Sequence, residues 1–368
     1  MSAISSLKIH GFKSIRNLDL ELRNLNVLIG SNGAGKSNFI SLFQMNSELI
    51  EGRLQLWVQK QGGADRIFSF GIKNTNNITI GSRFGSNAYL FSLLPTVYGG
   101  LVFQAEKVFI FKDEEQILSD FEAGHKESNL KDLRLKGDDP IQIEIASHCY
   151  NAMSRWKIYH FHDTSEFAGM RRLSALHDQA TLRGDGSNLA AYLFHLRESH
   201  PDVYAMIRKT VTLAAPFFDD FVLNPRQLPT GEEQIQLLWR QKGSDYPLWP
   251  SQLSDGTLRF ICLVTALSQP EAPSTILIDE PELGLHPYAI TLLGALMRMA
   301  SQRMQVIVST QSVPLINEFS IDDLLIVERE EGNTVFRRHT QESFAAWLES
   351  YSVGDLWMKN LLGGRPRA

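Results

Sequence analysis

A glycine-rich loop between an apolar strand and a helix constrains this chain more than any other feature of its sequence. The apolar pattern of residues 26–29 predicts a short buried strand, and apolar residues recur at helical spacing over residues 36–50. Between them, Gly30-Ser31-Asn32-Gly33-Ala34-Gly35-Lys36-Ser37 matches the pattern G-x-x-x-x-G-K-[ST]. Glycines in such a loop let successive backbone N–H groups point at one anion, and the following helix adds its positive end. The sequence therefore predicts a phosphate-binding loop.

An acidic pair supplies the chemistry that such a loop needs. Lys36 would reach the β- and γ-phosphates of a nucleotide, and the Ser37 hydroxyl would ligate Mg²⁺. The apolar strand at residues 275–278 ends in Asp279 and Glu280. At the carboxyl end of a parallel strand beside the loop, Asp279 would hold Mg²⁺ through water and Glu280 would polarise the attacking water. ATP and Mg²⁺ are the predicted ligands.

Two more polar segments lie close to this pair in the sequence. Residues 253–256, Leu-Ser-Asp-Gly, open a helix, so the Ser254 hydroxyl and the Gly256 amide could form a second anion site. Taken alone, the segment is better explained as a helix N-cap by Ser254. The strand at 305–308 runs into Ser309-Thr310-Gln311-Ser312, which would bring polar side chains near a γ-phosphate.

The pattern of strands and helices indicates an α/β chain with a mixed sheet around the loop. After residue 250, apolar strands alternate with helices, which indicates a parallel sheet covered on both faces. Strands are expected near 7–11, 18–22, 67–72, 78–80, 102–111, 141–145, 157–161, 221–223, 234–239, 275–278 and 305–308. Helices are expected at 188–196, 203–218, 257–267 and 288–299, a β-meander at 61–115 and an exposed excursion at 120–140.

Composition excludes several classes of protein. Apolar residues make up 43% and charged residues 21% of the 368, which argues against intrinsic disorder. The formal charge of −5 gives no overall attraction to DNA or anionic membranes. No apolar run approaches the roughly 20 residues that span a bilayer, and no secretory signal is visible. The only cysteines, Cys149 and Cys262, lie far apart. We expect a soluble, cytoplasmic protein without membrane insertion.

The order GSNGAGKS, LSDG, ILIDEPELGLHP, VIVSTQS resembles the ATP-binding cassette superfamily. Within it, the opening LKIHGFKSIRNLDLEL and the ending YSVGDLWMKNLLGGRP resemble SMC/RecF-type heads grouped among AAA family ATPases, including stand-alone bacterial ones. The resemblance implies a P-loop ATPase head that hydrolyses ATP and forms a homodimer around two ATP molecules, in DNA maintenance, repair or anti-phage defence. DNA and a separately encoded nuclease or effector are the candidate partners.

The same resemblance assigns sites and segments. Catalytic roles fall to Glu280, Gln311 and Lys36, metal binding to Ser37 and Asp279, and nucleotide binding to Lys13, Ser14, Gly30, Ser31, Asn32, Gly33, Ala34, Gly35, Lys36, Ser37, Asn38, Ser254 and Gly256. Ser254 and Gly256 would close on the nucleotide of the partner subunit. A single head over 1–368 is expected, with a phosphate-loop lobe at 1–60, an inserted β-meander and helical segment at 61–250, a signature lobe at 251–340 and a C-terminal helical segment at 341–368.

The sequence departs from the family pattern at two places. The family usually has histidine where this chain has Gln311, so we expect slow turnover, because glutamine can donate to a phosphate oxygen but carries no charge. The glutamine that links the two lobes in the family has no clear counterpart here, and Gln104 is one candidate.

Two other functions stay open at this stage. The ATPase subunit of a membrane transporter would carry its signature much closer to the phosphate loop than Leu253 lies to Ser37. A nucleotide-sensing scaffold with little turnover is disfavoured by Glu280 and favoured by Gln311.

Two clusters of residues are read as structural. The histidines in His160-Phe161-His162 share one face of an expected strand, but a zinc site usually needs further ligands, so a packed polar edge is the preferred interpretation. Arg171 and Arg172 are expected to be solvated charges.

Overall fold

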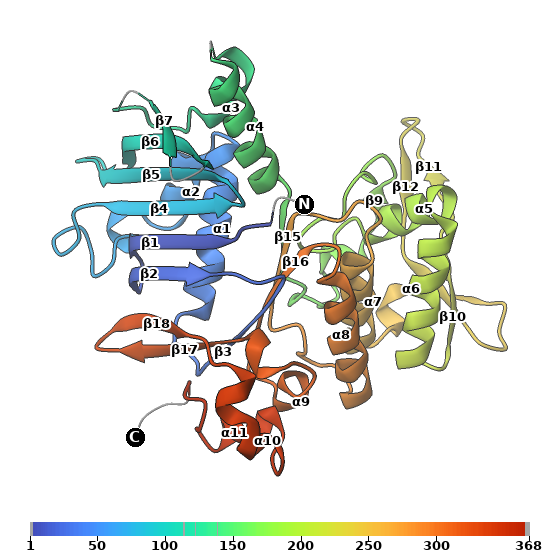
Figure 1. Ribbon diagram of the computed structural model, residues 1–368. Coiled ribbons are helices and arrows are strands. Elements are labelled where there is room, and N and C mark those ends of the chain that lie inside the picture. The colour runs from blue at the N-terminus through green and yellow to red at the C-terminus, as the bar shows by residue number, and fades with distance from the viewer. Residues whose placement is uncertain (1–2, 113–114, 122, 138, 365–368) are drawn as a thin grey trace.

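A computed structural model describes residues 3–112, 115–121, 123–137 and 139–364. It contains two six-stranded sheets, a core sheet and an antiparallel sheet, with helices between and around them (Figure 1). The mixed α/β architecture expected from the sequence is confirmed.

The core sheet positions the phosphate loop. Its strands, in spatial order, are β18 (Asn333–Arg337), β17 (Leu324–Glu330), β3 (Leu25–Ile29), β16 (Gln305–Thr310), β15 (Thr275–Asp279) and β8 (Trp156–Tyr159). All neighbours are parallel except β18, which pairs antiparallel with β17. Every residue of β3 and β16 is buried, as continuously apolar parallel strands require. The loops that follow β3, β15 and β16 therefore leave the sheet at the same end, the carboxyl end of the parallel strands.

The antiparallel sheet lies beside the first helices. Its strands, in spatial order, are β2 (Ile15–Glu21), β1 (Ser6–Phe12), β4 (Ile78–Phe84), β5 (Asn87–Pro95), β6 (Leu101–Lys112) and β7 (Glu115–Asp120). The helices on this side are α1 (Lys36–Ile50), α2 (Leu54–Lys60), α3 (Leu130–Lys136) and α4 (Pro140–Ser154). Helix α1 packs against the core sheet through Phe43, whose ring centroid lies 4.9 Å from that of Trp156. It thereby fills the space between the two sheets.

The other face of the core sheet carries the remaining helices. These are α5 (Leu189–Ser199), α6 (Pro201–Ala214), α7 (Asp255–Leu267) and α8 (Pro287–Ala300), followed near the C-terminus by α9 (Val313–Ile316), α10 (Ala345–Leu348) and α11 (Val353–Met358) (Figure 1). Val27 and Ile29 of β3 belong to the apolar core on this side, whereas Leu28 belongs to the core around α1. The two-residue alternation of a strand thus divides the molecule into two hydrophobic cores.

Short elements complete the chain. Small three-stranded sheets contain β10 (Phe218–Val222), β13 (Leu238–Gln241) and β14 (Pro247–Leu248), and β11 (Arg226–Gln227), β12 (Glu233–Ile235) and β9 (Ser174–Ala175). Single turns of 3₁₀ helix are η1 (Ala64–Arg66), η2 (Gly169–Arg171), η3 (Pro250–Gln252), η4 (Ile321–Asp323) and η5 (Gln341–Phe344). Across the described residues, no helix combines the length and the apolarity that crossing a membrane requires.

Several expected elements differ in the structure. The strand expected at 141–145 is wrong, because these residues belong to α4, which Asp139 caps through Ile141 N and which Pro140 begins. Isoleucines at every second position looked like a strand, but the buried residues of α4, including Ile145, Cys149 and Ala152, follow helical spacing.

The strand expected at 67–72 is also wrong, since only an isolated bridge joins Phe68 to Phe12. The strand expected at 234–239 divides into β12 and β13, which belong to different sheets, and the helix expected at 203–218 ends at Ala214 before Pro216. Within the excursion expected at 120–140, α3 buries Leu130. Residues 61–250 supply β4 to β7 of the antiparallel sheet, β8 of the core sheet and helices α3 to α6.

Candidate functional site

The phosphate loop has the backbone of an anion cradle. It connects β3 to α1, and Gly33 and Gly35 adopt φ values of 77° and 117°, in the region that favours glycine. A Cβ on Gly35 would overlap the Thr334 side chain, so the close approach of β18 also requires glycine there. Since the loop leads directly into α1, the free N–H groups of that helix face the same space. The residues present therefore fit a phosphate group.

Lys36 is held inside this cradle. Its Nζ donates hydrogen bonds to the carbonyl oxygens of Gly30, at 2.6 Å, and Ser31, at 3.1 Å. Burial lowers the pKa of Lys36, and the nearby carboxylates of Glu280, Asp279 and Glu282 act in the opposite direction. The ammonium thus lies between the loop and three acidic groups, where a phosphate or a metal ion would find complementary charge.

The acidic pair lies at the carboxyl end of β15, as parallel packing requires. The Ser309 hydroxyl donates to Asp279 Oδ1, and the backbone N–H of Glu280 donates to Ser309 O at 3.0 Å. Glu280 has φ of 41°, an uncommon value for a residue other than glycine, and such strain concentrates at functional sites. Ser309 of β16 therefore fixes both acids next to the strand that borders β3.

Gln311 joins the acidic pair to the phosphate loop. Its Nε2 donates to Glu280 Oε1 at 2.9 Å and to Asn32 Oδ1 at 2.7 Å. The carboxyl ends of β3, β15 and β16 are thereby connected through side chains that the sequence had assigned to one site. Asp279, Glu280, Gln311 and Lys36 are brought together, and Ser37 is exposed at the start of α1.

Glu282 is a functional candidate that the sequence reasoning missed. Its Oε1 accepts hydrogen bonds from Thr310 Oγ1 at 2.6 Å and from Gln311 N at 3.2 Å, while its enclosed Oε2 has no partner among the described residues. Burial raises the pKa of Glu282, and the neighbouring Glu280 adds to the effect. A second acid two residues after Glu280 was the available signal. By accepting from Gln311 N, Glu282 supports the backbone that carries Gln311.

Ser14 and Asn38 lie on the other side of the loop. Asn38 Nδ2 donates to Ser14 Oγ at 2.6 Å, and Ser14 Oγ lies 2.6 Å from Thr334 Oγ1, which donates to Ala34 O at 2.9 Å. This chain of hydrogen bonds joins the segment after β1 to the loop and to β18. Ser14 and Asn38 are therefore adjacent to the loop, where the sequence placed them.

Lys13 points toward α1. Its Nζ donates to Ser41 Oγ at 2.6 Å and to Gln61 Oε1 at 3.1 Å, and burial lowers the pKa of the Lys13 ammonium. Gln104, the candidate for the glutamine that links the lobes, accepts from Ser92 Oγ at 3.2 Å within the antiparallel sheet. Gln61 thus contacts Lys13, whereas Gln104 contacts a neighbouring strand of the antiparallel sheet.

The two histidines after β8 lie beside the acidic pair. His162 Nε2 donates to Asp279 O at 2.9 Å, and Gln44 Nε2 lies 2.9 Å from His160 Nε2. Burial lowers the pKa of His160. The described residues contain no group of three or more His, Cys, Asp or Glu side chains placed to hold a metal ion. His162 thus contacts the backbone of the proposed metal ligand, and His160 contacts a side chain of α1.

The Leu-Ser-Asp-Gly segment begins α7. Ser254 is exposed and caps the helix, because its Oγ accepts from Thr257 N at 3.2 Å. Gly256 packs so closely on the 281–287 loop that a Cβ would overlap the carbonyl oxygen of Gly284. Among the residues that the structure describes, neither Ser254 nor Gly256 forms a hydrogen bond with the phosphate loop of the same chain. Ser254 is thus exposed at the start of the helix, whereas Gly256 is partly buried.

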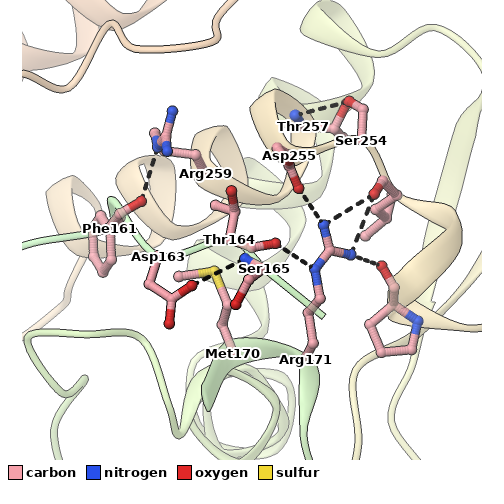
Figure 2. A network of polar contacts seen from close by, with 12 residues as sticks. Phe161, Asp163, Thr164, Ser165, Met170, Arg171, Ser254, Asp255, Thr257 and Arg259 are labelled. Atoms are coloured by element: carbon pink, nitrogen blue, oxygen red, sulfur yellow. Dashed lines mark hydrogen bonds and ion pairs between the residues drawn. The ribbon is translucent and has the colours of Figure 1, made fainter. Parts of the chain in front are cut away.

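Arg171 holds this segment in place, and its expected solvation is wrong. The residue is only 8% exposed. Its Nη2 lies 2.7 Å from Asp255 Oδ1, its Nε donates to Thr164 O at 2.9 Å, and its Nη1 donates to the carbonyl oxygens of Pro250 and Leu253 (Figure 2). The planar guanidinium matches several acceptors at once. Nothing in an Arg-Arg pair read from sequence distinguishes this buried side chain from an exposed one.

Arg259 of α7 makes a second set of contacts with the segment after β8. Its Nε donates to Phe161 O at 2.8 Å, its Nη2 donates to His162 O at 3.0 Å, and its Nη1 donates to Leu283 O (Figure 2 shows the first of these bonds). Helix α7 is therefore tied both to the segment after β8 and to the loop after β15. Each of these segments also borders Asp279 or Glu280.

Comparison with known proteins agrees with this geometry. A family model described as "AAA domain, putative AbiEii toxin, Type IV TA system" matches residues 25–317. The structure of an SMC head bound to the C-winged helix domain of ScpA is similar with a TM-score of 0.57 at 14% identity, covering 94% of this chain and 99% of that chain. An SMC head with an extended coiled coil, bound to the C-terminal domain of ScpA derived from Pyrococcus furiosus, gives 0.52 at 13% identity, covering 95% and 99%.

At such low identity the two solved structures show the fold alone, which is that of SMC-type P-loop ATPase heads. No curated protein matches the sequence. The expected resemblance to SMC/RecF-type heads and AAA family ATPases is confirmed by the family model and by the fold.

We expect Glu282→Gln to change how stability depends on pH. A carboxyl group whose pKa is raised on folding contributes stability that is present below its unfolded pKa, near 4.5, and lost as pH rises through the folded pKa. The free energy of unfolding of Glu282→Gln, relative to the parental protein, should therefore increase as pH rises from 4.5 to neutrality. Urea unfolding at several pH values measures it, and a difference that is constant with pH would contradict the shift.

Arg171→Met should destabilise the protein by about 2–3 kcal/mol, since it leaves several buried carbonyl oxygens without a donor. The neighbouring exposed Arg172 provides the matched control, because Arg172→Met should change the free energy of unfolding by less than about 0.5 kcal/mol. Denaturant unfolding compares the two variants. An equal decrease in the free energy of unfolding of both variants would mean that the hydrogen bonds of Arg171 do not stabilise the protein.

Proposed function

The chain belongs to the AAA-domain family matched by its sequence, and on that premise we propose that it binds ATP with Mg²⁺ at the phosphate loop and hydrolyses the terminal phosphate. The observation that carries the proposal is the hydrogen-bonded set formed by Asn32, Gln311 and Glu280. Through Gln311, two hydrogen bonds connect Glu280, the candidate general base, to Asn32 of the phosphate loop. A structural glycine turn would not need this connection.

The residues of the site have complementary tasks in this proposal. The backbone of Gly30 to Ser37 cradles the phosphates, and Lys36 neutralises their charge. Ser37 and Asp279 would hold Mg²⁺, which supplies charge neutralisation on the phosphate oxygens. Glu280 accepts a proton from the attacking water, and Gln311 keeps that carboxylate oriented by donating to it.

We also propose that two copies close around two ATP molecules. Ser254 offers an exposed hydroxyl at the N-terminus of α7, and Gly256 lies in the first turn of that helix, which is a suitable arrangement for an anion carried by another molecule. Because they have no described hydrogen bond to their own phosphate loop, they are available to the nucleotide of a second subunit. In this arrangement each subunit completes the site of its partner.

The process we propose is DNA maintenance, repair or defence in the cytoplasm. The model of the matched family is described as "AAA domain, putative AbiEii toxin, Type IV TA system", and the fold is shared with two SMC heads that are each bound to a domain of ScpA. DNA and a separately encoded nuclease or effector are accordingly the partners to test. Stimulation of phosphate release by added DNA would support the DNA role.

Glu280→Gln should keep ATP binding and lose hydrolysis by roughly 10²–10⁴-fold, because the amide fills the same volume and can still accept from Gln311 but cannot take a proton. Phosphate release measures turnover, and calorimetry measures binding. Glu271→Gln is the matched control, since this exposed glutamate precedes the amino end of β15 and should leave the rate unchanged. Parental turnover in Glu280→Gln would assign the base to another group.

Ser254→Arg should bind ATP but neither dimerise nor hydrolyse it, because the bulky cation blocks closure while its own phosphate loop is intact. Mixing it with Lys36→Ala creates one composite site whose parts are both parental, and partial hydrolysis should return. Light scattering follows dimers, and phosphate release follows turnover.

The matched control for this experiment is Ser244→Arg. Ser244 is also exposed and also accepts a backbone N–H, that of Tyr246, at 3.3 Å. It should dimerise and turn over ATP normally. If Ser254→Arg dimerises and hydrolyses ATP normally, the Leu-Ser-Asp-Gly segment acts only as a helix cap, and the proposed dimer site is wrong.

A further inference from the structure

A cavity of about 1070 Å³ lies at the opposite end of the core sheet from the phosphate loop. It is lined by Lys157 near the start of β8, by the loop of residues 269–273 before β15, and by Arg303 before β16. These are the amino ends of the parallel strands, whereas Asp279 and Glu280 lie at the carboxyl end of β15. The five residues of β15 separate the two ends by about 15 Å at the rise of a strand. The cavity is therefore separate from the nucleotide site proposed above.

Three cations line this cavity, and none of them forms an ion pair with the residues that the structure describes. Arg155 Nη2 donates to Ala272 O at 2.5 Å, and Arg303 Nη1 donates to Gln269 O at 3.2 Å. Carbonyl oxygens orient the two guanidinium groups but do not neutralise them, and each guanidinium keeps further N–H donors. The third cation, Lys157, has no hydrogen bond or ion pair to a described residue. In a chain with a formal charge of −5, such a cluster indicates an anionic ligand.

Tyr192 of α5 adds a hydroxyl to the same cavity. The residue is only 4% exposed, and its hydroxyl has no hydrogen-bond partner in the described part of the chain. Burial raises the pKa of Tyr192 to about 12, and the Glu271 carboxylate, which also lines the cavity, adds to the effect. The hydroxyl therefore faces the cavity. Because an enclosed hydroxyl without a partner costs free energy, it indicates a ligand that accepts a hydrogen bond from it.

The size of the cavity and the rest of its lining fit an organic phosphate better than a bare ion. Sites for small molecules measure about 300–1,000 Å³, so inorganic phosphate would leave most of this space unfilled. His195 and His200 contribute aromatic rings whose centroids lie 5.9 Å apart, and Pro270 and Pro273 contribute apolar surface. Aromatic rings beside cations are the lining on which proteins bind bases and phosphates.

We propose that this cavity binds a nucleoside monophosphate, separately from the phosphate loop. Arg155, Lys157 and Arg303 neutralise its phosphate, and the Tyr192 hydroxyl donates to a phosphate oxygen. The nucleoside lies against the histidine rings. A nucleic-acid strand is the less suitable occupant, because it needs a charged groove that continues along its backbone. The inference does not depend on ATP hydrolysis, since no residue of the phosphate loop or of the acidic pair takes part in it.

The experiment is a calorimetric titration with AMP. The parental protein should bind AMP, and it should bind adenosine, which lacks the phosphate, at least about 10-fold more weakly. Lys157→Gln should lower the affinity for AMP by roughly 10- to 100-fold, as loss of one charged donor does. Tyr192→Phe should lower it by roughly 3- to 10-fold. The same variant should keep the parental midpoint of urea unfolding, because the hydroxyl has no described partner to lose.

Two variants outside the cavity provide matched controls. Lys209 is exposed on α6, so Lys209→Gln should bind AMP as the parental protein does. Tyr204 is buried like Tyr192, but its hydroxyl donates to Asp220 Oδ1 at 2.8 Å. Tyr204→Phe should therefore unfold at a lower urea concentration and bind AMP normally.

Lys36→Ala distinguishes this cavity from the phosphate loop, because it should bind AMP with the parental affinity. The proposal is overturned if the parental protein does not bind AMP, or if AMP binding disappears in Lys36→Ala. Unchanged AMP affinity in Lys157→Gln and Tyr192→Phe overturns it as well. Tighter binding of a deoxythymidine decamer than of AMP, weakened by Lys157→Gln, would assign the cavity to a nucleic-acid strand instead. None of these measurements involves ATP hydrolysis, so failure of the proposed function would leave their outcome intact.

Discussion

The burial of β3 on both faces is the constraint on which the rest of the structure depends. All five of its residues are buried, with Val27 and Ile29 facing one core and Leu28 the other. A strand buried in this way has to lie inside a parallel sheet, and its glycine loop then emerges between neighbours on both sides. β15 and β16 supply the acids and Gln311 on one side, while β17 and β18 lie on the other, with Thr334 on β18. The two sides of the phosphate loop therefore present different side chains.

The segment that follows β8 connects the two candidate anion sites of one chain. It starts beside the acidic pair, where His162 donates to Asp279 O, and it ends at Arg171, which holds Asp255 at the start of α7 (Figure 2). Arg259 reinforces the connection, because it donates to Phe161 O and His162 O from the same helix. The Arg171 guanidinium is enclosed and donates to several carbonyl oxygens, so buried hydrogen bonds hold the segment after β8 against the start of α7.

Sequence patterns identified the elements whose side chains are uniform in character. The strands at 275–278 and 305–308 and the helix at 257–267 were predictable, because continuous apolar runs leave few alternatives. The three isoleucines and two polar residues that alternate over 141–145 fit a strand as well as a helix, and only packing against α3 and the antiparallel sheet decides between them. The strand expected at 67–72 is wrong because the backbone turns there, with Gly71 N donating to Phe68 O, and its apolar residues divide between buried Ile67 and Phe68 and exposed Phe70 and Ile72.

The residues of the candidate site likewise fall into those that a local sequence pattern predicts and those that only the folded structure reveals. Gly30 to Ser37, Asp279 and Glu280 form motifs in which spacing along the chain carries the information. Arg171 and Phe70 depend on contacts with residues far away in the sequence, such as Asp255 and Gly332. Neither residue type is unusual in a loop, so no local pattern separates them from ordinary surface side chains. The burial of Arg171 and the exposed, strained conformation of Phe70 are properties of the folded chain.

Gln311 shows why the departure from the usual histidine matters physically. One amide nitrogen carries two hydrogens, and here it donates to Asn32 Oδ1 and to Glu280 Oε1 at the same time. A neutral imidazole has a single N–H and could satisfy only one of these acceptors, while a protonated one would satisfy both only below its pKa. The amide therefore connects the phosphate loop to the acidic residue at any pH, without placing a positive charge beside the carboxylate. In return, it cannot supply the charge that an imidazolium would bring to a developing phosphate anion, so the arrangement favours a constant geometry over electrostatic stabilisation at this position.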